Sequence, residues 1–174
     1  MALQYRKKIR DAILSFLSNP ATGFNPTLNG LANIYGLTPF VIDWTGNSGN
    51  FAISHIDKGN IEVCQLTDYP GACLYTTDVI DKGDPRGFSF SGKVMAHLVF
   101  FVREREGVEA FNTEDEFDAI EDAAVSVLNN AANQWPQGVI FARLTQMERE
   151  YLLPLGDGFG TSIPIGTLFE LYVP

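Results

Sequence analysis

The chain has 174 residues, of which 45% are hydrophobic and 12% aromatic, and a formal net charge of −9. This is enough apolar material for a packed core and excludes a chain that is disordered throughout. The acidic balance excludes nonspecific wrapping of nucleic acid, because phosphate binding needs clustered Lys and Arg. No run approaches the roughly 20 apolar residues that span a bilayer, so we expect no membrane segment.

An amphipathic helix is predicted at about residues 3–17, where Ile9, Ile13 and Leu17 share one face. The positive charge followed by apolar residues also resembles a signal peptide, but Asp11 and Ser15 interrupt the apolar part. A group of basic residues begins this helix: Arg6, Lys7, Lys8 and Arg10. They indicate either a solvated helix face or a docking surface for an acidic neighbour.

The next part of the chain is rich in Gly, Asn, Pro and Thr, and we expect an ordered connection with a short helix around Leu28–Tyr35. Strands are then predicted at Pro39–Asp43, Phe51–Ile56, Ile61–Thr67 and Ala72–Thr77. The last two strands form a predicted hairpin around Tyr69-Pro70-Gly71. An acidic loop at Asp78–Arg86 follows.

The clearest predicted strand is Phe88–Arg103. Its even positions carry no polar side chain, and its odd positions are polar at the ends with apolar members between them. Sixteen extended residues span about 50 Å, far more than a common strand. We therefore expect this strand to bend at Gly92 or to project beyond the core.

A second helix is predicted at about residues 113–133. Thr113 and Glu116 have the spacing of a capping box, and an apolar stripe from Phe117 to Ala131 follows. Two closing strands, Val139–Leu155 and Ser162–Val173, flank the loop Gly156–Gly160. The predicted fold is α+β in one domain (residues 1–174): a mostly antiparallel sheet, two main helices packed on it, and a long projecting strand or hairpin.

Two loops resemble ligand sites only in outline. The glycines at 156–160 precede a strand, whereas a phosphate loop needs a helix N-terminus after them. The aspartates Asp78, Asp81 and Asp84 lack the distal glutamate and flanking helices of a calcium loop. We interpret the first as a hairpin loop and the second as solvated charges.

No catalytic arrangement is evident around the two histidines, His55 and His97, because no nucleophile can be placed beside either. Cys64 and Cys73 lack the spacing of a zinc site and are interpreted as free, partly buried thiols. We therefore expect no enzyme, no cofactor and no metal. A small enzyme or ligand-binding domain that uses His55 or His97 remains the alternative from a different class.

Several stretches of the chain resemble the neck and tail-completion proteins of long-tailed phages, and the tail terminator class in particular. The segments that carry this resemblance are PATGFNPTLNGLANIYG (20–36), FSFSGKVMAHLVFFVRER (88–105), EDEFDAIEDAAVSVLNNA (114–131), GVIFARLTQ (138–146) and GTLFELYV (166–173). In that class a small α+β protomer forms a ring, commonly a hexamer, that caps the tail tube and joins it to the head. The resemblance lies in the order of the elements and in the general character of the segments. It assigns no functional role to any single residue.

This resemblance implies a structural virion protein of the tail or neck, made in the host cytoplasm. Its implied partners are copies of itself, the tail tube protein and a head-side neck or connector protein, while DNA passes without specific binding. A head-side connector is the alternative within the same class.

Three groups of residues are our candidate contacts. The basic group on the first helix would face a neighbouring ring or tube. Subunit contacts are expected at Met95, His97, Val99, Phe101 and Arg103 on the long strand, and at Glu148, Arg149 and Glu150. The charges at 148–150 either face water or set the register between neighbouring subunits. Because the long strand is apolar on both faces, charged residues at positions 99 and 101 are expected to abolish assembly and spare the monomer fold.

Overall fold

The computed structural model describes residues 2–38, 40–53, 66–68, 70–76, 80–83, 89–103, 110–130, 139–144, 148–151 and 158–172. Side chains are described for residues 7–38, 40–53, 66–68, 70–76, 96–101 and 115–130. In these ranges the helices are α1 (Ala2–Leu17), α2 (Phe24–Tyr35) and α3 (Ala110–Asn130). The first predicted helix is thus confirmed, and the short helix expected around Leu28–Tyr35 begins one turn earlier.

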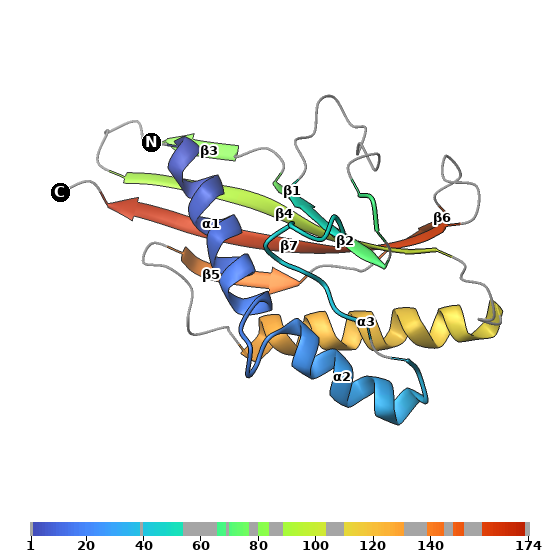
Figure 1. Cartoon of the computed structure of the whole chain (residues 1–174). Helices are drawn as coiled ribbons and strands as arrows, with labels where there is room; N and C mark the ends of the chain where they lie inside the picture. Colours follow the sequence, from blue (N-terminus) through green and yellow to red (C-terminus); the bar gives the residue numbers. More distant parts are fainter. Residues whose placement is uncertain are drawn as a thin grey trace.

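The described strands form one sheet (Figure 1). They are β1 (Phe51–Ile53), β2 (Gly71–Thr76), β3 (Ile80–Gly83), β4 (Ser89–Arg103), β5 (Val139–Leu144), β6 (Glu148–Tyr151) and β7 (Gly158–Tyr172). The order is β1-β2-β4-β7-β5, with β3 beside β4 and β6 beside β7. Only the β1–β2 pair among these is parallel. The predicted α+β class with a mostly antiparallel sheet is therefore confirmed.

The long predicted strand is confirmed as β4, and it lies at the centre of the sheet. It pairs with β7 residue by residue, from Ser89 opposite Tyr172 to Arg103 opposite Gly158. Figure 1 shows these two strands running past α1 at the end where β3 lies. The projecting element is therefore a paired ribbon, in which each long strand satisfies the backbone hydrogen bonds of the other.

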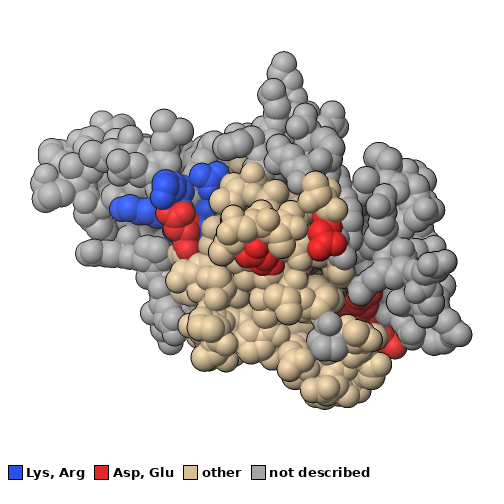
Figure 2. Space-filling model, viewed as in Figure 1, with Lys and Arg blue, Asp and Glu red and all other residues tan. Residues whose placement is uncertain are grey.

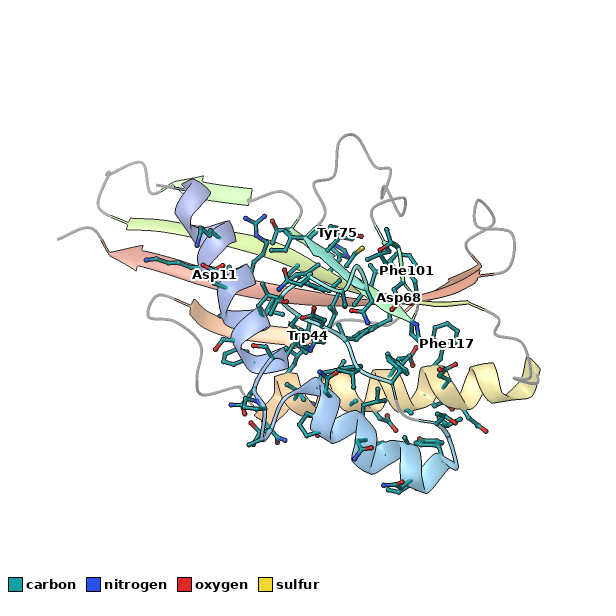
Figure 3. The ribbon with its side chains drawn as sticks, in the orientation of Figure 1. Asp11, Trp44, Asp68, Tyr75, Phe101 and Phe117 are labelled. Atoms are coloured by element: carbon teal, nitrogen blue, oxygen red, sulfur yellow. The ribbon has the colours of Figure 1, made fainter. Side chains whose placement is uncertain are left out.

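The three helices cover one face of the sheet and enclose the main core. Even-numbered residues of β4, namely Ala96, Leu98 and Phe100, face this core. Phe24 of α2 stacks on Phe100 with ring centroids 4.9 Å apart, and Trp44 meets Phe24 edge to face at 5.5 Å. Figure 3 shows Trp44 between the sheet and the helices. On α3 the predicted apolar stripe is buried as far as Leu128.

The opposite face of the sheet holds a second, smaller cluster. Val99 and Phe101 of β4 pack there with Cys73 and Tyr75 of β2 and with Leu66. Figure 3 shows Tyr75 and Phe101 on the side of the sheet away from Trp44. Successive side chains of a strand point to opposite faces of the sheet, so β4 contributes its even residues to the main core and its odd residues to the second cluster.

The predicted strand at Pro39–Asp43 is wrong for residues 40–43, which lie outside the sheet. Two asparagine side chains take the place of a neighbouring strand. Asn25 accepts a hydrogen bond from Ile42 N at 3.0 Å and donates one to Ile42 O at 2.9 Å. Asn50 accepts from Asp43 N at 2.9 Å and donates to Val41 O at 2.8 Å. The segment therefore has its hydrogen bonds without joining a ladder.

The predicted hairpin before β2 is also wrong where it is described. The edge of β2 that Leu66 and Thr67 were expected to join is occupied by β1, with Phe51 opposite Ala72. Thr67 N instead donates to Gly49 O at 2.9 Å, so its backbone hydrogen bond goes to the loop before β1 and not to β2. Residues 61–65 lie outside the described residues.

Three other boundaries differ from the predictions. The expected acidic loop contains β3, which pairs with residues 90–93 of β4 because that edge is free beyond β2. The capping box is wrong, since α3 begins at Ala110 and Thr113 therefore lies inside the helix instead of preceding it. The strand predicted at Val139–Leu155 is two strands, β5 and β6, along different parts of β7.

Residues Gly158–Gly160 of the expected glycine loop belong to β7, because β4 pairs with all three and β6 pairs with the last two. His55, Cys64, Asp78, Asp84, Ala131 and Val173 lie outside the described residues.

Candidate interaction surface

The basic group on α1 is placed on the outside of the helical layer. Lys7 and Lys8 are exposed and Arg10 is half-buried, while Ile9 and Ile13 face the core. Lys7 Nζ lies 2.6 Å from Asp11 Oδ2, one turn along the helix. Figure 2 shows these basic residues as one blue group over α1. Arg6 belongs to the same helix, and its side chain is outside the described set. The group therefore remains a candidate contact, with part of its charge balanced by Asp11.

The contacts expected on β4 need correction. Val99 and Phe101 are only 4% and 1% exposed, because they pack in the cluster behind the sheet. A charged residue at either position would be buried in the chain itself, so we now expect it to unfold the protomer. The second apolar face of this strand therefore packs inside the protomer and does not form a contact between protomers. Met95 and Arg103 lie in register with Gly166 and Gly158 of β7, and their side chains are not described.

His97 lies at the rim of this second cluster. Its ring stacks on that of Tyr75 in the adjacent strand, with centroids 4.7 Å apart and planes 10° from parallel. Partial burial lowers the pKa of His97 below its ordinary value. Burial also raises the pKa of the nearby Cys73 thiol to about 11. Cys73 is a free, buried cysteine, as expected from the sequence.

The charged triplet Glu148, Arg149 and Glu150 lies on β6. This strand pairs with residues 159–162 of β7, and no other described strand pairs with it. The candidate contacts therefore do not form one surface. The basic group lies among the helices, the triplet lies at a sheet edge, and Val99 and Phe101 are internal.

A surface that the sequence reasoning missed lies on α2. Ile34 is 79% exposed, the most exposed large hydrophobic residue among those described. Around it on the same helix are exposed residues of small or amide type, Asn29, Gly30 and Asn33. Helix α2 presents these residues outward because Phe24, Leu28 and Ala32 are buried on its other side.

Two glycines set the ends of α2. A Cβ at Gly23 would collide with the backbone of Leu17 and Asn19. Gly36 adopts a left-handed conformation (φ 69°), and its N–H bonds to Ala32 O. Tyr35 near the end of α2 donates from its hydroxyl to Asp122 Oδ2 of α3 at 2.9 Å, and this bond raises the pKa of Tyr35. Helix α2 is thus fixed at both ends and tied to α3.

After Gly36 the chain returns along α2, because Asn25 holds Ile42 near the start of the helix. In this extended segment Ile42 points into the core at 1% exposure, while the preceding Val41 is 68% exposed. We call the exposed residues of α2 and of this return segment the neutral face: Asn29, Gly30, Asn33, Ile34, Thr38 and Val41. Figure 2 shows the surface over α2 without blue or red among the described atoms.

The signal for this surface was present in the sequence. From Ala12 to Ile42 the chain has 31 consecutive residues without Asp, Glu, Lys or Arg. By contrast, α3 carries Asp115, Asp118 and Asp122 on its outer part, and α1 carries the basic group. The helical layer therefore has three kinds of surface: basic, neutral and acidic.

In the described part of the chain, no helix is long and apolar enough to cross a membrane. The described residues also contain no group of three or more His, Cys, Asp or Glu side chains that could hold a metal ion.

No protein-family model matches the chain, and no curated protein does. Among solved structures, one match is a chain of the "Virion of native gene transfer agent (GTA) particle". It is 11% identical, with a TM-score of 0.42, over 88% of this chain and 100% of that chain.

Proposed function

We propose that this chain is a structural, non-enzymatic virion protein that forms a ring at the end of a phage-like tail, as a tail terminator does. The observation that carries the proposal is the succession of segments that resemble this class. These segments supply α2, β4, α3, β5 and β7. Two of these elements, β4 and β7, pair with each other in the interior of the sheet.

The chemistry of the surface supports a ring. A closed ring uses head-to-tail contacts, so each protomer needs two different surfaces that fit each other. The helical layer offers basic, neutral and acidic surfaces on one protomer. The proposed partners are copies of the chain, in a hexamer by resemblance, together with the tail tube protein and a head-side connector.

The acidic balance supports the proposed passage of DNA. A chain with a net charge of −9 repels phosphates, so DNA would move through such a ring without being held. Virion location and the absence of specific DNA binding belong to this proposal.

The test is negative-stain imaging of the purified full chain at high concentration, alone and mixed with tail tubes. We expect closed rings, or caps on the tube ends. Monomers that ignore the tubes at every concentration would overturn the proposal. Labelled protein on intact particles then separates the two positions, since a terminator lies on the tube side of the junction and a connector on the head side.

A second experiment addresses the non-enzymatic role. Replacing both His55 and His97 with Gln should leave ring formation and tube capping unchanged in protein that is still folded. Loss of a measurable catalytic activity in the same variant would instead favour the enzyme class.

A further inference from the structure

We infer that the basic group of α1 binds the acidic part of α3 in the next copy of the chain. The acidic part comprises Asp115, Asp118 and Asp122, of which the first and the last are exposed. This inference rests on the proposed ring and names the two surfaces that would meet in it. The occupant of the basic group is therefore a second copy of the chain.

The first argument is the separation of charge between the two helices. Helix α1 carries four Lys or Arg and one Asp, a net charge of +3, whereas α3 carries six Asp or Glu and no Lys or Arg, a net charge of −6. Every Lys or Arg whose side chain the structure describes lies on α1. Copies with a net charge of −9 repel each other in most orientations, and contact between a basic and an acidic surface is the orientation that attracts.

The second argument is the position of the two surfaces. A closed ring needs two different surfaces on each protomer, so that one surface meets the other on the next copy. Figure 1 shows the beginning of α3 on the side of the molecule away from α1, and Figure 2 shows the blue group over α1 apart from the red residues on that side. Among the described side chains, no ion pair joins α1 to α3. The two surfaces therefore do not neutralise each other within one protomer.

The third argument is the concentration of charge at each surface. In the basic group Lys7 pairs with Asp11, while the half-buried Arg10 has no carboxylate partner among the described residues. In the acidic part the Tyr35 hydroxyl donates to Asp122, and the pKa of Tyr35 is raised by that bond, by burial and by the charges of all three aspartates. The three carboxylates thus act at one place on α3. Opposite charges gathered in this way select the partner and its orientation.

The test reverses the charge of each surface in the full chain. The first variant is Lys7→Glu with Lys8→Glu, at two exposed positions of α1. The second is Asp115→Lys with Asp122→Lys, at two exposed positions of α3. It changes the net charge from −9 to −5, because each reversal adds two charges, and so weakens the general repulsion between copies. Circular dichroism and thermal melting check that each variant is folded.

Two further variants serve as controls. Asn29→Glu with Asn33→Glu adds negative charge at exposed positions of α2, outside both surfaces. Asp115→Lys alone removes no described hydrogen bond, and it takes the place of the second variant if the loss of the bond from Tyr35 to Asp122 unfolds that chain.

Assembly is measured by sedimentation velocity over a concentration series and by negative-stain imaging. We expect each charge-reversed variant alone to raise the concentration needed for assembly at least tenfold, and the α2 control to leave it unchanged. An equimolar mixture of the two reversed variants should assemble like the unmodified chain, in rings where the two variants alternate, because every contact again joins opposite charges. Normal assembly of the first variant alone, or a mixture that stays unassembled, would show the inference to be wrong while leaving the ring proposal standing.

Two other outcomes separate the inference from the ring proposal. If the first variant forms normal rings that no longer cap tail tubes, the basic group binds a different virion protein and the inference is overturned. If the unmodified chain forms only dimers, which each reversed variant loses and the mixture recovers, the contact between α1 and α3 is supported and the ring proposal fails.

Discussion

The two faces of the central sheet are built from the same strands and, among the described residues, bury clusters of different size. On the face that the helices cover, 20 buried residues of the described chain form one core. On the opposite face the described cluster has five, Leu66, Cys73, Tyr75, Val99 and Phe101. Strand β4 contributes to both. The comparison shows that apolar residues on both faces of a strand do not by themselves mark an exposed interface.

The largest expected loss of stability comes from truncating either of two neighbouring phenylalanines of β4, which face opposite sides of the sheet. Phe100→Ala removes the ring that stacks on Phe24 in the main core, and we expect a loss of about 3–5 kcal/mol in the free energy of unfolding. Phe101→Ala, on the second face, removes a ring that is also only 1% exposed, so we expect a loss of similar size. Urea unfolding of both variants measures the two losses. A much smaller loss for Phe101 would mean that the second face contributes less to stability than the burial of its ring indicates.

Thiol labelling tests whether the second face is closed to solvent. A Cys64→Ser variant leaves Cys73 as the only thiol. Burial raises the pKa of Cys73 from 9.0 to about 11, so its thiolate fraction at pH 8 falls about a hundredfold. We expect native labelling to be at least that much slower than labelling in urea, and to accelerate as the pH rises. Similar rates with and without urea would contradict a closed second face.

The hydrogen bonds of Asn25 hold the segment that carries Ile42 and Trp44 into the main core. Removing them tests how much of the unfolding free energy depends on that segment. Asn25→Ala removes both hydrogen bonds to the backbone of Ile42, and we expect a loss of about 1–2 kcal/mol. The matched control is Asn29→Ala, at an exposed position of the same helix. Equal unfolding free energies for the two variants would show that the segment stays in place without Asn25.

The smallest expected effect is a pH dependence from His97. Because burial lowers its pKa in the folded chain, the unfolded chain binds a proton more readily. Stability should therefore fall as the pH decreases from the ordinary value near 6.5 toward the lower folded pKa. The unfolding free energy of the native chain and of His97→Gln, measured from pH 8 to pH 5, gives the contribution of His97. Parallel curves would place this ring in a more hydrated position than the structure does.

Sequence periodicity predicted the elements that bury a regular stripe. Helix α1, strand β4 and the stripe of α3 follow from spacing alone, because each repeats the period of its own structure. Residues 40–43 were wrongly predicted as a strand, since their hydrogen bonds come from the side chains of Asn25 and Asn50, which periodicity does not reveal. The pairing of β2 with β1 depended on a contact between segments that sequence alone does not bring together.

The candidate surface was predictable in part. The uncharged run from Ala12 to Ile42 can be read directly from the sequence. The exposure of Ile34 cannot, because Leu31 and Tyr35 on the same helix are apolar and pack against the core. Likewise, nothing in the sequence distinguishes Val99 and Phe101 inside a protomer from the same residues at a contact between protomers. Only the arrangement of the strands resolves that choice.

The pairing of β4 with β7 has a consequence for how the chain folds. Paired residues are between 55 and 83 positions apart along the chain, and α3, β5 and β6 lie between them. Folding slows as native contacts become less local, while helices form quickly from neighbouring residues. We therefore expect the helices to form early and the central ribbon late. Until β4 and β7 meet, each presents an unpaired edge of 15 residues, which is where association between unfinished chains would begin.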